Sequence, residues 1–321
     1  MMLSLNSNAQ IFTYAEDNPI ELGKVKWLRN YDEAQSRSEK ENKPIFILFQ
    51  EVPGCGNCTK YGQEILSHPL IIEAIEDEFV PLAIYNNVSG HDREVLKHFN
   101  EPTWNNPVVR IVNSNGAPVA KRVGNFLSKG ELISQMINGL EKEKKNIPMY
   151  LTLLQQEFSA EENGEDEFYL SMYCFWTGEK EIANIEGVVG TEAGWMHGRE
   201  VVKVNFDTKK TNEKAIALKA ANVRCADQVF SDVKPKVKIP FKKVGNYRKD
   251  NQDKYYLLQT KYKSIPMTEL QKSKVNSAIG SRQKPERYLS PRQIKMFKSR
   301  VITEVYVEKE FVESWYSAVG R

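Results

Sequence analysis

Two of the four cysteines in the chain are spaced as a redox pair. Cys55 and Cys58 form a C-x-x-C motif, and this spacing places both sulfur atoms within one turn of a helix. An apolar run that predicts a buried strand precedes the motif, so the first cysteine is expected at a helix N-terminus. The free N–H groups and partial positive charge there favour the thiolate and lower the pKa of that cysteine. The pattern predicts Cys55 as the attacking thiol and Cys58 as the resolving thiol of thiol–disulfide exchange.

A C-x-x-C motif is also half of a zinc site, and a zinc site needs two further ligands. No second pair of cysteine or histidine residues at ligand spacing follows in the first half of the chain, where His68, His91 and His98 stand alone. We expect these histidines at the surface or as helix caps. The sequence therefore predicts neither a metal site nor a cofactor. A chemically inert pair of cysteines is the other alternative to a redox pair.

The elements expected to position this pair alternate between helix and strand. A polar amphipathic pattern predicts a helix over residues 31–41, and a continuous apolar run predicts a buried central strand over residues 44–49. Two further strands and a helix are predicted beyond Pro107, at residues 108–112, 117–123 and 129–144. This order predicts an α/β fold for the first half of the chain.

The first half resembles the thioredoxin superfamily over residues 24–145. The resemblance rests on the C-x-x-C pair and on a stretch that leads into the strand before it, here Trp27, Tyr31, Ala34, Lys43 and Pro44. It implies a thioredoxin-like α/β domain, which we place at residues 1–155. It also implies that Pro107 follows a cis peptide bond beside the dithiol and helps to hold a bound substrate chain. The usual aromatic residue before the first cysteine is absent, since Gly54 occupies that position.

The third cysteine, Cys174, lies in the second half of the chain, just after a strand predicted at residues 168–172. It lies in the sequence Y-C-F-W, and a cysteine between aromatic residues is ordinarily a small buried core side chain. The elements predicted next are a short helix with Ile182 and Ile185 on one face, two strands at residues 187–194 and 200–206, and a helix at residues 212–222. This order predicts an α+β domain over residues 168–321, with an antiparallel-rich sheet and helices on one side.

Three segments of the second half resemble the class A peptide methionine sulfoxide reductases. The family signature G-C-F-W-G-x-E reads Y-C-F-W-T-G-E from Tyr173, and its G-V…T..G-Y segment reads G-V-V-G-T-E-A-G-W from Gly187. The family strand E-x-V-x-V-x-[FY]-D reads E-V-V-K-V-N-F-D from Glu200. The loop between the second and third segments is reduced to residues 196–199, and Trp195 stands at the first tyrosine of the family segment.

The resemblance implies a role for each matching residue. Cys174 is the nucleophile that attacks the sulfoxide sulfur, and Glu200 supplies a proton to the sulfoxide oxygen. The substrate pocket and the hydrogen bonds around the oxygen come from aromatic and polar residues, namely Phe175, Trp176, Trp195, Asp250 and Tyr255. The last two match the family motif N-D-x-G-x-Q-Y only in their spacing. Release of methionine leaves Cys174 as a sulfenic acid, which condenses with another thiol to form a disulfide.

The fourth cysteine, Cys225, lies at a predicted helix-to-strand turn. As a resolving cysteine it would attack the sulfenic acid on Cys174, which requires the two sulfur atoms to approach to disulfide geometry. The alternative is a small buried residue, and in that case Cys55 could resolve Cys174 directly.

Length and composition set the frame for these motifs. A chain of 321 residues is about twice the usual domain size, so two domains are expected. An acidic stretch around Asn163 and Gly164 predicts an exposed linker over residues 156–167. No segment approaches the ~18 uncharged apolar residues that span a membrane. The first residues do not read as a secretory signal, so the expected location is the cytoplasm, where structural disulfides are rare.

The positive charge is concentrated in residues 234–300, with 19 lysines and arginines against 4 acidic residues, whereas the whole chain carries a net charge of +3. Tyrosines among these lysines could stack on bases. No helix-turn-helix, zinc-finger or RNP signature accompanies them, so we expect a solvated face and no nucleic-acid partner. Ser290 and Pro291 predict the start of a helix. Residues 301–316 fit either a strand or a helix.

Together these patterns predict a thiol oxidoreductase that reduces methionine sulfoxide or a related sulfoxide, with the fused dithiol domain as electron donor. The expected partners are an oxidised protein or small-molecule sulfoxide and an external thiol reductant. The alternative is a protein disulfide reductase that works through Cys55 and Cys58, with a second domain that binds clients without catalysis. A redox-sensing protein that binds through its basic surface is a third hypothesis.

Overall fold

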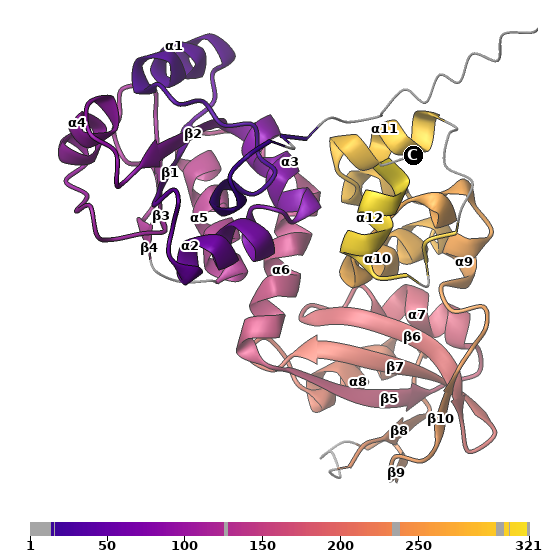
Figure 1. Cartoon of the computed structure of the whole chain (residues 1–321). Helices are drawn as coiled ribbons and strands as arrows, with labels where there is room; N and C mark the ends of the chain where they lie inside the picture. Colours follow the sequence, from indigo (N-terminus) through magenta and orange to yellow (C-terminus); the bar gives the residue numbers. More distant parts are fainter. Residues whose placement is uncertain are drawn as a thin grey trace, which may run out of the picture. The chain divides into compact units, whose positions relative to one another are not determined.

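A computed structural model of the chain describes residues 14–15, 17–124, 128–232, 238–299, 305–307 and 309–319 (Figure 1). Contacts along the chain group these residues into two compact units, with the boundary between Gln155 and Gln156. Among the described residues, the first unit contains a four-stranded sheet and the second a six-stranded sheet. In the same residues, no helix has the length and apolar character needed to cross a membrane.

The first sheet has the strand order β2-β1-β3-β4 (Figure 1). Strand β1 (Ile45–Gln50) pairs in parallel with β2 (Val80–Tyr85) and antiparallel with β3 (Val108–Val112). All six residues of β1 are buried. A central strand covered on both faces requires this continuous apolar run, which is why the sequence pattern predicted it.

Helices pack on both faces of the first sheet. Alternate residues of β1, such as Ile47, pack against α1 (Tyr31–Glu41) and α4 (His91–His98) in one buried cluster. The other helical segments of the unit are η1 (Ile20–Leu22), α2 (Gly56–Lys60), the π-helical turn η2 (Tyr61–Ile65), α3 (Pro69–Glu78) and α5 (Lys129–Lys142). The predicted helix over residues 31–41 and strand over 108–112 have the bounds expected from the sequence.

The strand predicted at residues 117–123 is largely wrong. Strand β4 contains only Val123 and Gly124, and Pro118 forms a single bridge with Val112. Proline has no N–H to donate, so this segment cannot continue a ladder of hydrogen bonds at that position.

The second sheet has the strand order β10-β6-β7-β5-β8-β9. Its strands are β5 (Glu165–Ser171), β6 (Val188–Met196), β7 (Arg199–Asp207), β8 (Gln228–Phe230), β9 (Phe241–Lys242) and β10 (Tyr247–Lys249). Among the described strands, every pairing except the parallel pair β8–β9 is antiparallel. The second unit is therefore a mixed helix and sheet structure with an antiparallel-rich sheet.

One face of this sheet forms the main core of the second unit. Residues such as Leu170 of β5 and Val202 of β7 alternate toward α7 (Phe175–Ile182) and α8 (Glu213–Asn222). The remaining helical segments are α9 (Tyr255–Leu258), η3 (Lys261–Ser264), α10 (Glu269–Gly280), η4 (Pro285–Tyr288), α11 (Pro291–Ser299) and α12 (Phe311–Val319). The sequence left residues 301–316 undecided; α12 includes the last of them, and residues 301–304 and 308 lie outside the described residues.

The acidic segment at residues 156–167 differs from the expected exposed linker. Helix α6 (Met149–Asn163) continues through it, and β5 begins at Glu165 directly after Gly164, whose φ is 98°. Glu157 accepts a hydrogen bond from the N–H of Leu270, and burial raises the pKa of its carboxyl to about 7. Glutamate favours helices, so an acidic composition alone does not indicate a loop. The division into domains 1–155 and 168–321 stays a prediction.

Candidate functional site

The dithiol lies where β1 leads into helix α2. After β1 the chain passes through a cis peptide bond before Pro53, and Cys55 occupies the N-cap position of α2. Cys55 is exposed, and Cys58 is buried one turn later. The two sulfur atoms lie 3.6 Å apart. The strand-to-helix junction predicted from the sequence therefore presents one thiol to solvent and shields the other.

The two thiols differ in their affinity for a proton. The backbone N–H of Cys58 hydrogen-bonds the sulfur of Cys55 and lowers the pKa of Cys55 below its ordinary value, although burial acts in the opposite direction. Burial raises the pKa of Cys58 to about 12. The direction for Cys55 is the one predicted from its place at a helix N-terminus. This asymmetry favours Cys55 as the thiolate that attacks and Cys58 as the thiol held in reserve.

Asn106 and Pro107 lie beside the dithiol, because β3 follows them directly and pairs with β1. The Asn106–Pro107 peptide bond is cis, as the resemblance implied. The thiol of Cys58 donates to Oδ1 of Asn106 at 2.8 Å, and the sulfur of Cys55 lies 3.8 Å from the same oxygen. The sequence analysis missed Asn106 as a site residue. Its position directly before the predicted cis-proline was the available signal.

Glu51 also reaches the dithiol and was not predicted. One of its carboxylate oxygens and the sulfur atoms of Cys55 and Cys58 all lie within 4.8 Å of one another. Two thiolates and a carboxylate are donors that zinc accepts in a site with an open fourth position. Glu51, Cys55 and Cys58 are therefore the side chains that could hold such a cation. The absence of a metal stays a prediction.

The asymmetry of the dithiol predicts ordered alkylation. In the reduced protein, iodoacetamide should modify Cys55 first, at a rate that rises through a pH range below that of an ordinary thiol, because the thiolate is the reacting species. Cys58 should react only near its pKa of about 12. Peptide mass spectrometry after timed alkylation at several pH values measures both rates. A Cys55→Ser variant is the control, and equal rates at the two positions in wild type would contradict the prediction.

The second cluster of predicted site residues forms around Cys174 at the start of α7. Cys174 is half-buried and occupies the N-cap position of this helix. Glu200 lies near the start of β7, and its Oε2 accepts a hydrogen bond from the N–H of Phe175 at 2.8 Å. Strand β5, which leads to Cys174, pairs with β7, so the sheet brings the carboxylate to the residue that follows the cysteine.

Aromatic side chains from three segments meet beside Cys174. The ring of Phe175 contacts Trp195 of β6 edge-on, with 5.3 Å between ring centroids. Trp176 stacks on Tyr255 of α9 with 3.9 Å between centroids. The indole N–H of Trp195 donates to Oδ1 of Asp250 at 3.4 Å. The residues that the weakest sequence match singled out, Asp250 and Tyr255, thus contact the aromatic neighbours of Cys174.

Cys225 is buried in the turn after α8. Its backbone N–H donates to the carbonyl of Ala220 at 2.8 Å, and its sulfur lies 3.5 Å from the carbonyl of Val223. Burial raises the pKa of Cys225, and the charges of Glu181 and Cys174 act in the same direction. The role of Cys225 as resolving cysteine stays a prediction.

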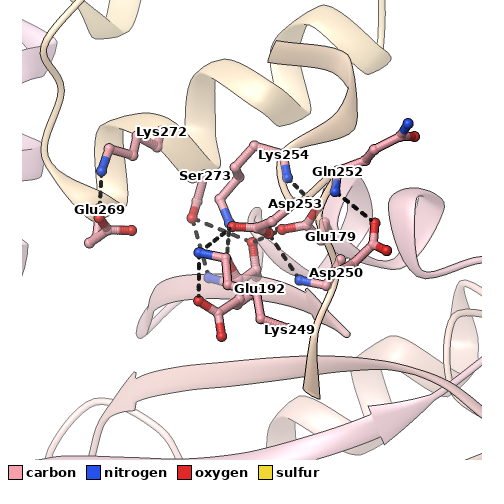
Figure 2. Close-up of polar contacts among 12 residues, drawn as sticks. Glu179, Glu192, Lys249, Asp250, Gln252, Asp253, Lys254, Glu269, Lys272 and Ser273 are labelled. Atoms are coloured by element: carbon pink, nitrogen blue, oxygen red, sulfur yellow. Dashed lines mark hydrogen bonds and ion pairs between the residues drawn. The ribbon is translucent and has the colours of Figure 1, made fainter. Parts of the chain in front are cut away.

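A buried ion cluster in the second unit was also missed. Lys254 is fully buried and contacts Glu179 of α7 and the neighbouring Asp253 (Figure 2). This corrects the expectation that residues 234–300 form a solvated face, at least for Lys254 and for Lys272, which is 3% exposed. A lysine is almost never fully buried unless it is paired, and the partner Glu179 of Lys254 lies 75 residues away, so a local sequence pattern does not reveal it.

The comparisons with known proteins concern the dithiol region. Residues 26–114 match a family described as thioredoxin-like. The solved structure titled "DsbH Oxidoreductase" aligns with a TM-score of 0.32 and 18% identity, over 39% of this chain and 90% of that one. A putative disulphide-isomerase from Bacteroides thetaiotaomicron aligns with a TM-score of 0.31 and 23% identity, over 36% of this chain and 93% of that one. No curated protein matches the chain.

Proposed function

We propose that this chain, in which residues 26–114 belong to a thioredoxin-like domain, is a thiol oxidoreductase that reduces methionine sulfoxide or a related sulfoxide at Cys174. The observation that carries the proposal is the contact between Glu200 and the N–H of Phe175, which sets a carboxylate at the start of the helix that Cys174 begins. A nucleophilic sulfur and a proton donor at one helix start are the two groups that sulfoxide reduction requires.

The chemical step consumes one thiolate and one proton. The thiolate sulfur of Cys174 attacks the sulfoxide sulfur and forms a sulfur–sulfur bond, while Glu200 delivers a proton to the sulfoxide oxygen. The sulfur–oxygen bond and the new sulfur–sulfur bond then break as the hydroxyl passes to the sulfur of Cys174. The sulfoxide gains two electrons and leaves as the thioether, while Cys174 loses two electrons and becomes a sulfenic acid. Glu200 then recovers its proton from solvent, since its side chain is half-buried.

The aromatic side chains fit the apolar part of such a substrate. Phe175 is buried, and Trp176 and Trp195 are half-buried around it, so they offer an apolar surface that remains open to solvent. The hydrogen bond from Trp195 to Asp250 and the stacking of Trp176 on Tyr255 hold these rings in place. A methyl group attached to the sulfoxide sulfur would be desolvated against this surface, which favours binding.

A series of further thiol reactions would return the enzyme to its reduced state. The thiol of Cys225 attacks the sulfenic acid on Cys174, forming a disulfide and releasing water. Cys55 then attacks that disulfide, and Cys58 releases the mixed disulfide by forming a bond with Cys55. An external thiol reduces the Cys55–Cys58 disulfide. Tethering the dithiol domain to its oxidised partner raises the effective concentration of reductant to about millimolar.

Replacement of Glu200 by glutamine tests the proposal. Without a proton donor at the sulfoxide oxygen, turnover of free methionine sulfoxide with dithiothreitol should slow by about 10²- to 10⁴-fold. Release of methionine, quantified by amino-acid analysis, measures this rate. Glu161→Gln, at an exposed glutamate of α6, is the matched control and should keep the wild-type rate. No methionine release by the wild type would overturn the proposed function.

A protein disulfide reductase with a non-catalytic second domain is the second candidate. The exposed Cys55 beside the cis-bonded Pro107 favours it, because this arrangement can act on an oxidised client without Cys174. A wild type that reduces protein disulfides but no sulfoxide would support this candidate. The cytoplasmic location inferred from the sequence remains a prediction in either case.

A further inference from the structure

Three ionisable side chains lie together in the interior of the second unit. The side chains of Glu179, Lys254 and Asp253 are 0%, 1% and 6% exposed. Removal of one such ion from water costs several kcal/mol unless its partners compensate. The proposed reaction uses none of these three residues, so their retention in a core needs another reason.

Lys254 connects two elements of the unit. Its Nζ donates to Oε1 of Glu179 on α7 at 2.8 Å and to the carbonyl of Thr191 on β6 (Figure 2). The backbone N–H of Lys254 donates to Oε2 of the same glutamate at 3.1 Å. Both ends of the lysine, the main chain and the ammonium, therefore hold it against α7.

Asp253 adds a second connection to β6. Its Oδ1 accepts from Nζ of Lys254 at 3.1 Å and from the backbone N–H of Ala193 at 3.0 Å. Lys249 pairs with the other oxygen at 3.3 Å. The segment that contains Asp253 and Lys254 is thus attached to β6 through side chain and backbone together.

This attachment falls between two residues of the proposed sulfoxide site. Asp250, which accepts from Trp195, comes before Asp253, and Tyr255, which stacks on Trp176, comes directly after Lys254. Lys254 itself has a φ of 59°, in the left-handed region that non-glycine residues adopt at a cost. The buried contacts are what hold the chain in this conformation, and the conformation sets where Tyr255 begins α9.

The charges in the cluster balance if one carboxyl keeps its proton. Burial raises the pKa of Glu179 well above its ordinary value. Burial acts in the same direction on Asp253, but the charge of Lys254 and the N–H of Ala193 outweigh it and lower the pKa of Asp253. With an ionised Asp253 and a protonated Glu179, the three side chains of Glu179, Asp253 and Lys254 together carry no net charge. A neutral side chain of the same shape at residue 179 should therefore disturb the cluster least.

We infer that Lys254, bound between Glu179 and Asp253, is a positioning residue that holds Asp250 and Tyr255 against the aromatic neighbours of Cys174. This inference rests on the proposed function. As a positioning residue, Lys254 acts through Asp250, four residues before it in the sequence, and through Tyr255, directly after it. Loss of the contacts should free the segment and unstack Tyr255 from Trp176.

The test compares two buried lysines in the full-length protein. Lys254→Met removes the cluster's cation, and Lys272→Met removes an equally buried lysine whose Nζ pairs with Glu269 on α10 and donates to the carbonyl of Lys309 (Figure 2). Steady-state reduction of methionine sulfoxide with dithiothreitol gives kcat and KM for each. We expect kcat/KM to fall about 100-fold in Lys254→Met, the usual cost of a misplaced group, and to change little in Lys272→Met.

Two more readouts separate positioning from general destabilisation. Tryptophan fluorescence should change in Lys254→Met and not in Lys272→Met, because only the first loses the stacking on Trp176. Glu179→Gln keeps an acceptor for Nζ and should lose less activity than Lys254→Met. If Lys254→Met fails to fold, Lys254→Gln, which keeps a donor, replaces it in both measurements.

The outcomes distinguish this inference from the proposed function. An active wild type with equal activity and fluorescence in Lys254→Met and Lys272→Met would overturn the positioning role alone. An inactive wild type would overturn the proposed function, and with it the sulfoxide role of the cluster. A selective loss in Lys254→Met, with a fluorescence change, would support the inference.

Discussion

Replacement of Cys174 by serine is expected to abolish sulfoxide reduction, with a loss of about 10³-fold or more when dithiothreitol supplies the electrons. A serine hydroxyl is a poor nucleophile toward sulfur and cannot store the reaction's oxidising equivalents as a sulfenic acid. The measurement is release of methionine from methionine sulfoxide. Dithiothreitol bypasses the dithiol domain, so the loss reports on Cys174 and not on the supply of electrons.

In reactions without added reductant, the number of sulfoxide molecules reduced per chain should report which of the four thiols supply electrons. Each sulfoxide consumes two thiols, so the reduced wild type, whose four cysteines are free, can reduce two sulfoxides per chain. Cys55→Ser should stop after one, because Cys174 and Cys225 alone remain as a pair. In a Cys225→Ser variant, a disulfide between Cys174 and Cys55 would identify Cys55 as the cysteine that resolves the sulfenic acid on Cys174. Undiminished turnover in Cys174→Ser would place the chemistry elsewhere.

Replacement of Cys55 by serine is expected to leave no disulfide exchange above the uncatalysed rate. Cys55 is the exposed thiol with the lowered pKa, whereas Cys58 is buried with a pKa of about 12 and has little thiolate at neutral pH. The thiolate is the attacking species, so Cys58 cannot replace Cys55. Reduction of insulin disulfides, followed by turbidity, measures this activity.

In the Cys58→Ser variant, the reduction of a client disulfide should instead stop at the mixed disulfide with Cys55. Cys55 can still attack a client disulfide, but no neighbouring thiol releases the mixed disulfide, which then accumulates and is detected by non-reducing gel electrophoresis or intact mass. Cys174→Ser is the control and should exchange insulin disulfides at the wild-type rate. Loss of insulin reduction in that control would contradict the assignment of the two activities to separate cysteines.

Much of the fold of the first unit could be predicted from the sequence, because the patterns that indicate its helices and strands are local. The buried run at β1, the polar helix α1 and the strand β3 each have a pattern complete within about ten residues. The helix predicted at 129–144 appears as α5 with nearly the same bounds. The prediction failed at β4: beyond the bridge at Pro118 and the hydrogen bond from Val119 to Ile111, pairing with β3 resumes only at Val123.

The second unit shows where local signals mislead. An acidic composition predicted a linker at residues 156–167, yet α6 and β5 occupy that segment. A basic composition predicted a solvated face, yet Lys254 is 1% exposed. In both cases the deciding contacts come from elements distant in sequence, such as α10 for Glu157 and α7 for Lys254.

The sequence by itself predicted the groups of the proposed chemistry: the spacing of Cys55 and Cys58 predicted a redox pair at a helix start, and a family resemblance implied roles for Cys174, its aromatic neighbours and Glu200. The C-x-x-C prediction follows from residue type and short spacing, because the geometry of one helical turn brings both sulfur atoms together. Only the tertiary structure decided what each group meets. Asn106 reaches Cys58 across 48 residues, and Lys254 reaches Glu179 across 75. Such contacts depend on strand pairing and on the burial of charges with their partners, and neither is a property of a local segment.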